Sequence, residues 1–119
     1  MRSVPRPGSI PSKREGRRYT RCLLDTRVLV EVFRSGSTTS IWGRTNELGE
    51  DGLSATLTAG LESGEVISLE FHLPMSTDPL KVRAVVRYRD GFRHGFEFLT
   101  LNNQQRGILQ RALSILPSE

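Results

Sequence analysis

Alternation of apolar and polar side chains with a period of two constrains the fold of this chain more than any other feature. In the clearest run, one set of alternate residues is mostly apolar and the other mostly basic: Leu80, Val82, Ala84, Val86 and Tyr88 against Lys81, Arg83, Val85, Arg87 and Arg89. Such a pattern is typical of a strand with one buried face. It predicts a strand whose outer face is basic.

Weaker alternation predicts further strands at 28–33, 38–46, 53–57 and 92–98, and a more continuous apolar run at 66–73 predicts a strand buried on much of both faces. In the last strand, Phe92, His94, Phe96 and Phe98 are predicted to point inward. Trp42 is expected in the core rather than at a surface that stacks on a ligand. Turn residues separate the strands, notably Ser35-Gly36-Ser37, Gly49-Glu50-Asp51-Gly52 and Asp90-Gly91.

Helical spacing is found only at the end of the chain. Asn102 can cap a helix together with Gln105, and the apolar residues Ile108, Leu109, Ala112, Leu113 and Leu116 would line one face. Six short strands followed by one helix, with no crossover helices between strands, indicate a closed or nearly closed antiparallel barrel. The helix is expected to seal one opening.

Size and composition indicate one domain. The chain has 119 residues, 36% of them hydrophobic, which suits a single core. Residues 1–13 are predicted to form a flexible tail and residues 14–119 the folded domain. Because the sequence has neither a membrane-length apolar run nor a secretion signal, a cytoplasmic protein without membrane insertion is expected. The single cysteine, Cys22, excludes an internal disulfide and is interpreted as a small residue at a strand entrance.

Positive charge is concentrated at the N-terminus. Residues 1–21 hold seven Lys or Arg and one acid, a net charge of +6, whereas residues 22–119 hold ten basic and twelve acidic residues, a net charge of −2. This distribution predicts an anionic partner at or near the N-terminal arm, with a solvated basic tail as the alternative.

Residues for catalysis or metal binding are not evident. The sequence shows no Ser-His-Asp or Cys-His arrangement, no paired catalytic carboxylates and no phosphate loop. His72 and His94 lie on separate strands without cysteines or carboxylates at ligand spacing. We therefore expect neither an enzyme nor a bound metal or cofactor.

Two motifs carry a family resemblance. The arm has Arg17 and Arg21 in an RxxxR pattern with Arg18 between them, and the segment Glu47-Leu48-Gly49-Glu50-Asp51-Gly52 follows the second predicted strand. Together they resemble the paired signature of the PilZ family, RxxxR and [D/N]xSxxG. In the second motif the acid is one carbon longer, the serine is replaced by Gly49, and the final glycine, Gly52, is kept. The resemblance extends over residues 14–116.

The resemblance implies an all-β fold: a six-stranded antiparallel PilZ-type barrel with one C-terminal α-helix and a disordered basic N-terminal arm. It also implies a bacterial receptor for cyclic di-GMP, with a site formed by the following residues: Arg17, Arg18, Arg21, Glu47, Gly49 and Gly52. Arginine suits this ligand because its planar fork of donors can bond guanine O6 and N7 or a phosphate. Glu47 would take the part of the acid, and Gly49 cannot supply the serine hydroxyl.

Binding is expected to order the arm, and the ordered face would then signal to an unidentified downstream protein in trans. The alternative is a degenerate PilZ domain that binds no nucleotide and acts as a protein-interaction module. A nucleic-acid binder that uses the arm and Arg83, Arg87 and Arg89 is a third possibility, but the sequence lacks the aromatic platform that such barrels normally show.

Overall fold

Seven strands and one helix make up residues 21–118, the part of the chain that the computed structural model describes. They are β1 (Cys22–Leu23), β2 (Arg27–Arg34), β3 (Ser37–Leu48), β4 (Gly52–Leu57), β5 (Val66–Phe71), β6 (Leu80–Asp90), β7 (Arg93–Thr100) and α1 (Asn103–Ile115). The predicted tail at 1–13, and with it the predicted disorder of the arm at Arg17 and Arg18, lies outside the described residues.

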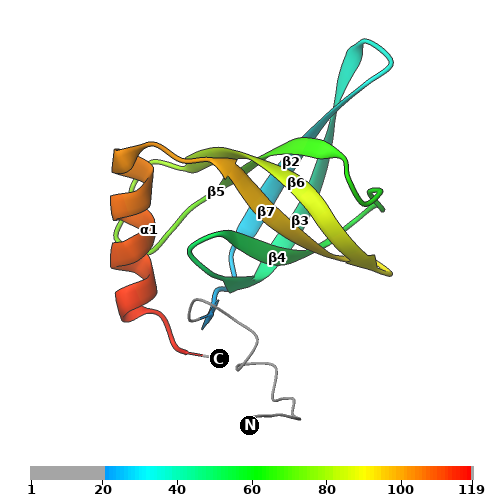
Figure 1. The fold of residues 1–119 in the computed structure, drawn as a ribbon. Helices are drawn as coiled ribbons and strands as arrows, with labels where there is room; N and C mark the ends of the chain where they lie inside the picture. The colour runs from blue at the N-terminus through cyan, green and yellow to red at the C-terminus, as the bar shows by residue number, and fades with distance from the viewer. Residues whose placement is uncertain (1–20, 119) are drawn as a thin grey trace, which may run out of the picture.

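The strands close into a barrel (Figure 1). Antiparallel neighbours follow the order β3-β2-β5-β6-β7-β4, and the additional pairing of β4 with β3 completes the ring. The short β1 pairs with the last two residues of β3. The predicted six-stranded antiparallel barrel with one C-terminal helix is therefore confirmed, with β1 as an addition.

The inward faces of the six barrel strands form the core. Val28, Val30 and Val32 on β2 are at most 2% exposed, as their alternation predicts. Helix α1 covers one end of the barrel through Leu109 and Ala112, which are 1% and 2% exposed (Figure 1). Its N-terminus carries the predicted capping box, because Asn102 Oδ1 accepts from the Gln105 N–H at 2.7 Å and Gln105 Oε1 accepts from the Asn102 N–H at 2.9 Å.

Strand β5 is buried on one face only. Ile67, Leu69 and Phe71 are buried, whereas Ser68 and Glu70 are half-buried and Val66 is 46% exposed. The prediction of burial on much of both faces was wrong, because the outer face of an antiparallel barrel strand is covered only by its own neighbours and solvent.

A β-bulge in β6 changes which residues face outward. Val86 pairs with Phe96 but Tyr88 pairs with Gly95, so Arg87 is the extra residue. Tyr88 was predicted to lie on the same inner face as Val86, and it is instead 47% exposed on the outside. Phe92, predicted to point inward, lies in the hairpin turn beside Gly91 and is 55% exposed, because the strand β7 begins one residue later.

The β2–β3 hairpin extends beyond the barrel (Figure 1). Its two-residue turn, Ser35-Gly36, has φ values of 51° and 79°, the signs that a type I′ turn requires. Trp42, expected in the core, is 47% exposed because alternation along β3 turns its neighbour Ile41 inward. The indole packs instead under the Arg27 guanidinium, whose carbon lies 4.5 Å from the ring centre.

Candidate functional site

Strand β1 brings the last arginine of the arm next to the second motif. Cys22 pairs with Leu48 and Leu23 with Glu47, so the chain runs antiparallel to the end of β3. Arg21 therefore lies beside the turn that follows β3, with its Nε 3.9 Å from the place that a Cβ would take on Gly49. Of the predicted arm residues, Arg21 alone falls within residues 21–118.

The break between β1 and β2 is held by a buried threonine. Thr45 is 2% exposed, and its hydroxyl donates to the Leu24 carbonyl at 2.6 Å and accepts from the Thr26 N–H at 3.0 Å. These bonds replace part of the strand pairing across the break, because buried backbone N–H and C=O groups need hydrogen-bond partners.

The turn between β3 and β4 contains two glycines with different surroundings. A Cβ on Gly52 would stand 2.0 Å from the Phe96 carbonyl oxygen, so β7 leaves no space there for a side chain. A Cβ on Gly49 would meet nothing closer than 3.7 Å, the distance to Asp51 Oδ1. The turn is closed by the Gly49 N–H, which donates to the Gly52 carbonyl at 2.8 Å. Only Gly52 is required by packing.

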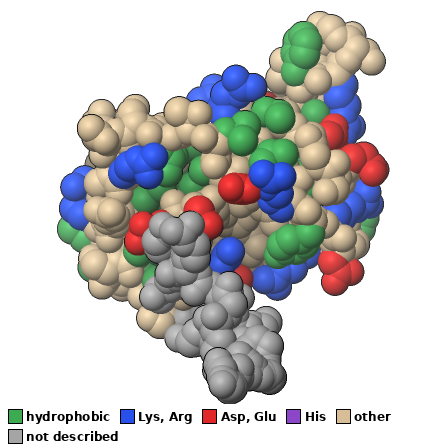
Figure 2. Space-filling model, viewed as in Figure 1, with side chains coloured by type: hydrophobic (Ala, Val, Ile, Leu, Met, Phe, Trp, Pro, Cys, Tyr) green, Lys and Arg blue, Asp and Glu red, His purple; other side chains and the backbone are tan. Residues whose placement is uncertain are grey.

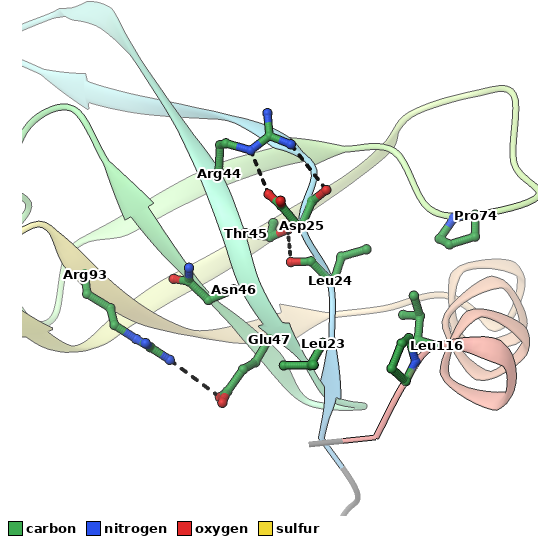
Figure 3. Close-up of a pocket in the computed structure, with 11 residues that line it drawn as sticks. Leu23, Leu24, Asp25, Arg44, Thr45, Asn46, Glu47, Pro74, Arg93 and Leu116 are labelled. Carbon is green, nitrogen blue, oxygen red and sulfur yellow. Dashed lines mark hydrogen bonds and ion pairs between the residues drawn. The ribbon is translucent and has the colours of Figure 1, made fainter.

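Glu47 is largely buried against an arginine of β7. Its Oε1 lies 3.8 Å from Arg93 Nη2, and its side chain is 14% exposed (Figure 3). Ser54 pairs with Glu47 across β3 and β4, and Arg93 also donates to the Ser54 hydroxyl at 3.5 Å. The predicted acid therefore already has a cationic partner, which sequence reasoning did not identify.

Arg21 lines a small cavity of about 270 Å³ on the outer wall of the barrel. Tyr88 forms one side of it, with its ring packed against Gly95: a Cβ on that glycine would be 2.0 Å from Tyr88 Cε2. Charged groups also line the cavity, namely Asp51 and the ion pair of Arg87 with Glu97. Gly95 lies within a predicted strand, and a glycine at such a position indicates the close approach of another group.

Glu47 and Arg93 line a second, larger groove of about 870 Å³, which extends along β1 to Leu116 and Pro117 (Figure 3). Arg44 lines it too, bonded to Asp25 with Nε 2.7 Å from Oδ1. Figure 2 shows basic and acidic side chains interspersed over the outer wall. The predicted residues thus divide between two neighbouring hollows, with Arg21 at one and Glu47 at the other.

The buried histidine has a structural part. His94 is 0% exposed, and its Nε2 accepts from the Leu61 N–H at 3.0 Å while Nδ1 lies 2.9 Å from the Phe92 carbonyl. Burial lowers its pKa.

Within residues 21–118, no group of three or more His, Cys, Asp or Glu could hold a metal ion. No helix in that range is long and apolar enough to cross a membrane.

Comparison with known proteins gives one family and one fold. The PilZ domain family matches residues 14–114. The PilZ domain of YcgR from Escherichia coli, solved with c-di-GMP, is 20% identical with a TM-score of 0.65, over 84% of this chain and 91% of that one. The PilZ domain of CeSA from a cellulose-synthesizing bacterium is 20% identical with a TM-score of 0.60, over 80% and 96%.

A third similar structure is the Bacillus subtilis inhibitor of motility MotI/DgrA, which is 19% identical with a TM-score of 0.61; the alignment covers 82% of this chain and 50% of that one. No curated protein sequence matches the chain at a significant level. At these identities the likeness concerns the fold.

Proposed function

Because this chain belongs to the PilZ domain family, we propose that it is a non-enzymatic receptor for cyclic di-GMP. The similar PilZ domain of YcgR was solved with that dinucleotide. The observation that carries the proposal is the approach of Arg21 to the β3–β4 turn, with Nε 3.9 Å from the Cβ position of Gly49. This approach brings the last arginine of the first motif next to the turn of the second motif, although the two are far apart in the sequence.

In the proposed site, Arg17, Arg18 and Arg21 hold the guanine edges and phosphates, since guanidinium groups form paired bonds to both. Tyr88 offers a half-exposed ring on which a purine can stack. Glu47 accepts from the guanine N1–H and N2–H groups once Arg93 turns toward the ligand. Gly52 adds no side chain to the turn. One hydrogen bond is missing at Gly49, which costs about 0.5 to 1.5 kcal/mol.

Signalling would follow from ordering of the arm. Residues 14–21 settle on the barrel when the ligand binds, and a downstream protein reads the new surface in trans. A cytoplasmic location is part of the proposal, since the ligand is a bacterial second messenger.

Calorimetric titration with cyclic di-GMP tests the receptor directly. We expect binding heat from the wild type and its loss in Arg17→Ala and Arg21→Ala. Arg111→Ala is the control, because this exposed arginine on α1 carries the same charge but lines a different hollow, beside residues 74–81. Equal loss in all three variants would indicate a general charge effect and contradict the assigned site.

A rival function is favoured by Gly49 and by the Glu47–Arg93 pair, since both reduce what the second motif can offer a nucleotide. In that case the chain is a PilZ domain that binds proteins without a nucleotide. Absence of heat from the folded wild type, together with an unchanged amide spectrum at high micromolar ligand, would support the rival and exclude the receptor.

A further inference from the structure

The outer edge of β3 is open along the projecting hairpin. Strand β4 pairs with β3 only from Gly43 onward, while β2 pairs with β3 as far as Ser37. Along 37–41, no strand among residues 21–118 therefore pairs on the side of β3 away from β2 (Figure 1). Residues 37–40 are exposed, and Figure 2 shows the hairpin standing clear of the body.

The backbone groups on this edge are set by the alternation of the strand. The Trp42 carbonyl accepts from the Thr58 N–H at 3.0 Å, so the backbone polar groups of Trp42 face away from β2. In an antiparallel pair, alternate residues direct these groups to opposite sides. Thr38 and Ser40 therefore present their N–H and C=O groups to the open side, whereas Thr39 and Ile41 direct theirs to β2.

The edge lacks the features that usually prevent strand association. Residues 37–41 read Ser-Thr-Thr-Ser-Ile, without a charge, a proline or a bulge. Natural edge strands are commonly protected by lysine, proline or a bulge. Beside Thr38, across the hairpin, stands Phe33, an aromatic side chain that is 72% exposed. An edge of this kind is suited to the addition of another strand.

We propose that this edge pairs antiparallel with the same edge of a second copy of the chain, about a two-fold axis at Thr39. In this register Thr38 lies opposite Ser40 of the second copy, so both sets of open backbone groups are satisfied reciprocally. The hydroxyls of Thr38 and Ser40 lie on one face and can bond across the strands. A second copy is favoured because the edge has no charged residue that would repel its own image or select a foreign sequence.

Cysteine cross-linking tests the register. In the proposed dimer, the two Thr39 residues form a non-hydrogen-bonded pair with Cα atoms about 4.5 Å apart, within the range of a disulfide. Thr39→Cys should give at least about ten times more oxidised dimer than Ser37→Cys, whose copies would be separated by several residues. Native Cys22 is 1% exposed and does not compete. Equal yields, or no dimer from Thr39→Cys, would overturn the proposal.

A second measurement needs no new cysteine. As the wild type is concentrated from about 10 μM to about 1 mM, where weak association is still populated, exchange of the Thr38 and Ser40 amides should slow while that of Thr39 and Ile41 stays constant. The double variant Thr38→Lys, Ser40→Lys should weaken dimerisation at least about tenfold, because like charges would face each other. A wild type that stays monomeric throughout, or edge amides protected only by a different protein, would contradict self-pairing.

Discussion

Gly49 and Gly52 belong to one turn, but the space available for a side chain differs between the two positions. Gly52 is fixed by the backbone of β7, whose Phe96 carbonyl oxygen would be 2.0 Å from any Cβ, whereas Gly49 has ordinary contact distances around it. Neither glycine has a positive φ, so their need for glycine is decided by space and not by backbone conformation. The two sites can therefore be tested independently.

Substitution of Gly49 by serine should improve binding of cyclic di-GMP. The side chain has space, and its hydroxyl would stand near the Arg21 guanidinium and Asp51. One added hydrogen bond of about 0.5 to 1.5 kcal/mol corresponds to a gain in affinity of roughly two- to tenfold. Calorimetry on Gly49→Ser measures it, with Gly49→Ala as the control that adds only the Cβ. Equal affinities in the serine and alanine variants would show that this position does not contact the ligand.

Substitution of Gly52 by alanine should destabilise the barrel. Its Cβ can be accommodated only if β4 and β7 move apart, and overpacking of this kind costs about 1 to 3 kcal/mol. Urea unfolding followed by circular dichroism provides the free energy of unfolding. Gly49→Ala, in the same turn, should change that free energy much less; a similar loss in both variants would mean that the turn, not the contact with Phe96, sets the cost.

At the scale of single elements, the sequence predicts most strands and the helix but not the irregularities that shape the site. Period-two alternation identifies the inward residues of β2, β4 and the first part of β6, and the Asn102 capping box identifies the start of α1. The bulge at Arg87 is not visible in the alternation, since Tyr88 simply continues it. The pattern therefore predicts the barrel wall but misses Tyr88 on its outside.

The partners of the site residues depend on strand register, which no local pattern specifies. Arg93 reaches Glu47 because β4 lies between β3 and β7 in the closed barrel. Trp42 was likewise misjudged, because β3 turns its neighbour Ile41 inward and leaves the indole outside, where it packs under Arg27. From the sequence, the motifs give the candidate residues, while the structure is needed for what surrounds them.

The buried His94 of β7, which accepts a hydrogen bond from Leu61 in the 58–65 loop, should make the free energy of unfolding depend on pH. Burial, with a smaller contribution from the charge of Arg89, lowers the pKa of His94 in the folded state. The unfolded chain therefore binds more protons below about pH 6.5, the ordinary value for histidine. The contribution of neutral His94 to the free energy of unfolding is complete above that pH. It declines as the pH falls, by at most about 1.4 kcal/mol per pH unit.

Urea titrations between pH 5 and pH 8 test this expectation. In the wild type, the free energy of unfolding should fall from about pH 6.5 downward. His94→Gln should be less stable at pH 8, because the bonds to Leu61 and Phe92 are disturbed, but flatter over the same range. Glu65, whose pKa the Arg34 hydrogen bond lowers, acts at more acidic pH and does not confound the window. Parallel profiles in the two proteins would exclude His94 as the cause.

Across the whole molecule, β1 connects the arm to the C-terminus. The Leu23 N–H donates to the Pro117 carbonyl at 2.8 Å, Cys22 forms a bridge with Ser118, and the Cys22 thiol lies 3.5 Å from the Leu113 carbonyl of α1. The base of the arm is thus held between β3 and the segment that follows α1. An arm that settles on the barrel begins from this anchored point, which lowers the conformational entropy that binding must remove.

Removal of residues 117–119 should therefore weaken binding of cyclic di-GMP without unfolding the barrel. The loss of one or two backbone bonds, each worth about 0.5 to 1.5 kcal/mol, limits the expected loss of affinity to between roughly twofold and roughly a hundredfold. Calorimetry measures the affinity, and exchange of the Leu23 amide, which should become faster, reports the lost anchor without a ligand. Ser118→Ala keeps the backbone and should behave as the wild type. If the truncated chain exchanges Leu23 faster yet binds with unchanged affinity, the C-terminal segment stabilises β1 but makes no contribution to the proposed site.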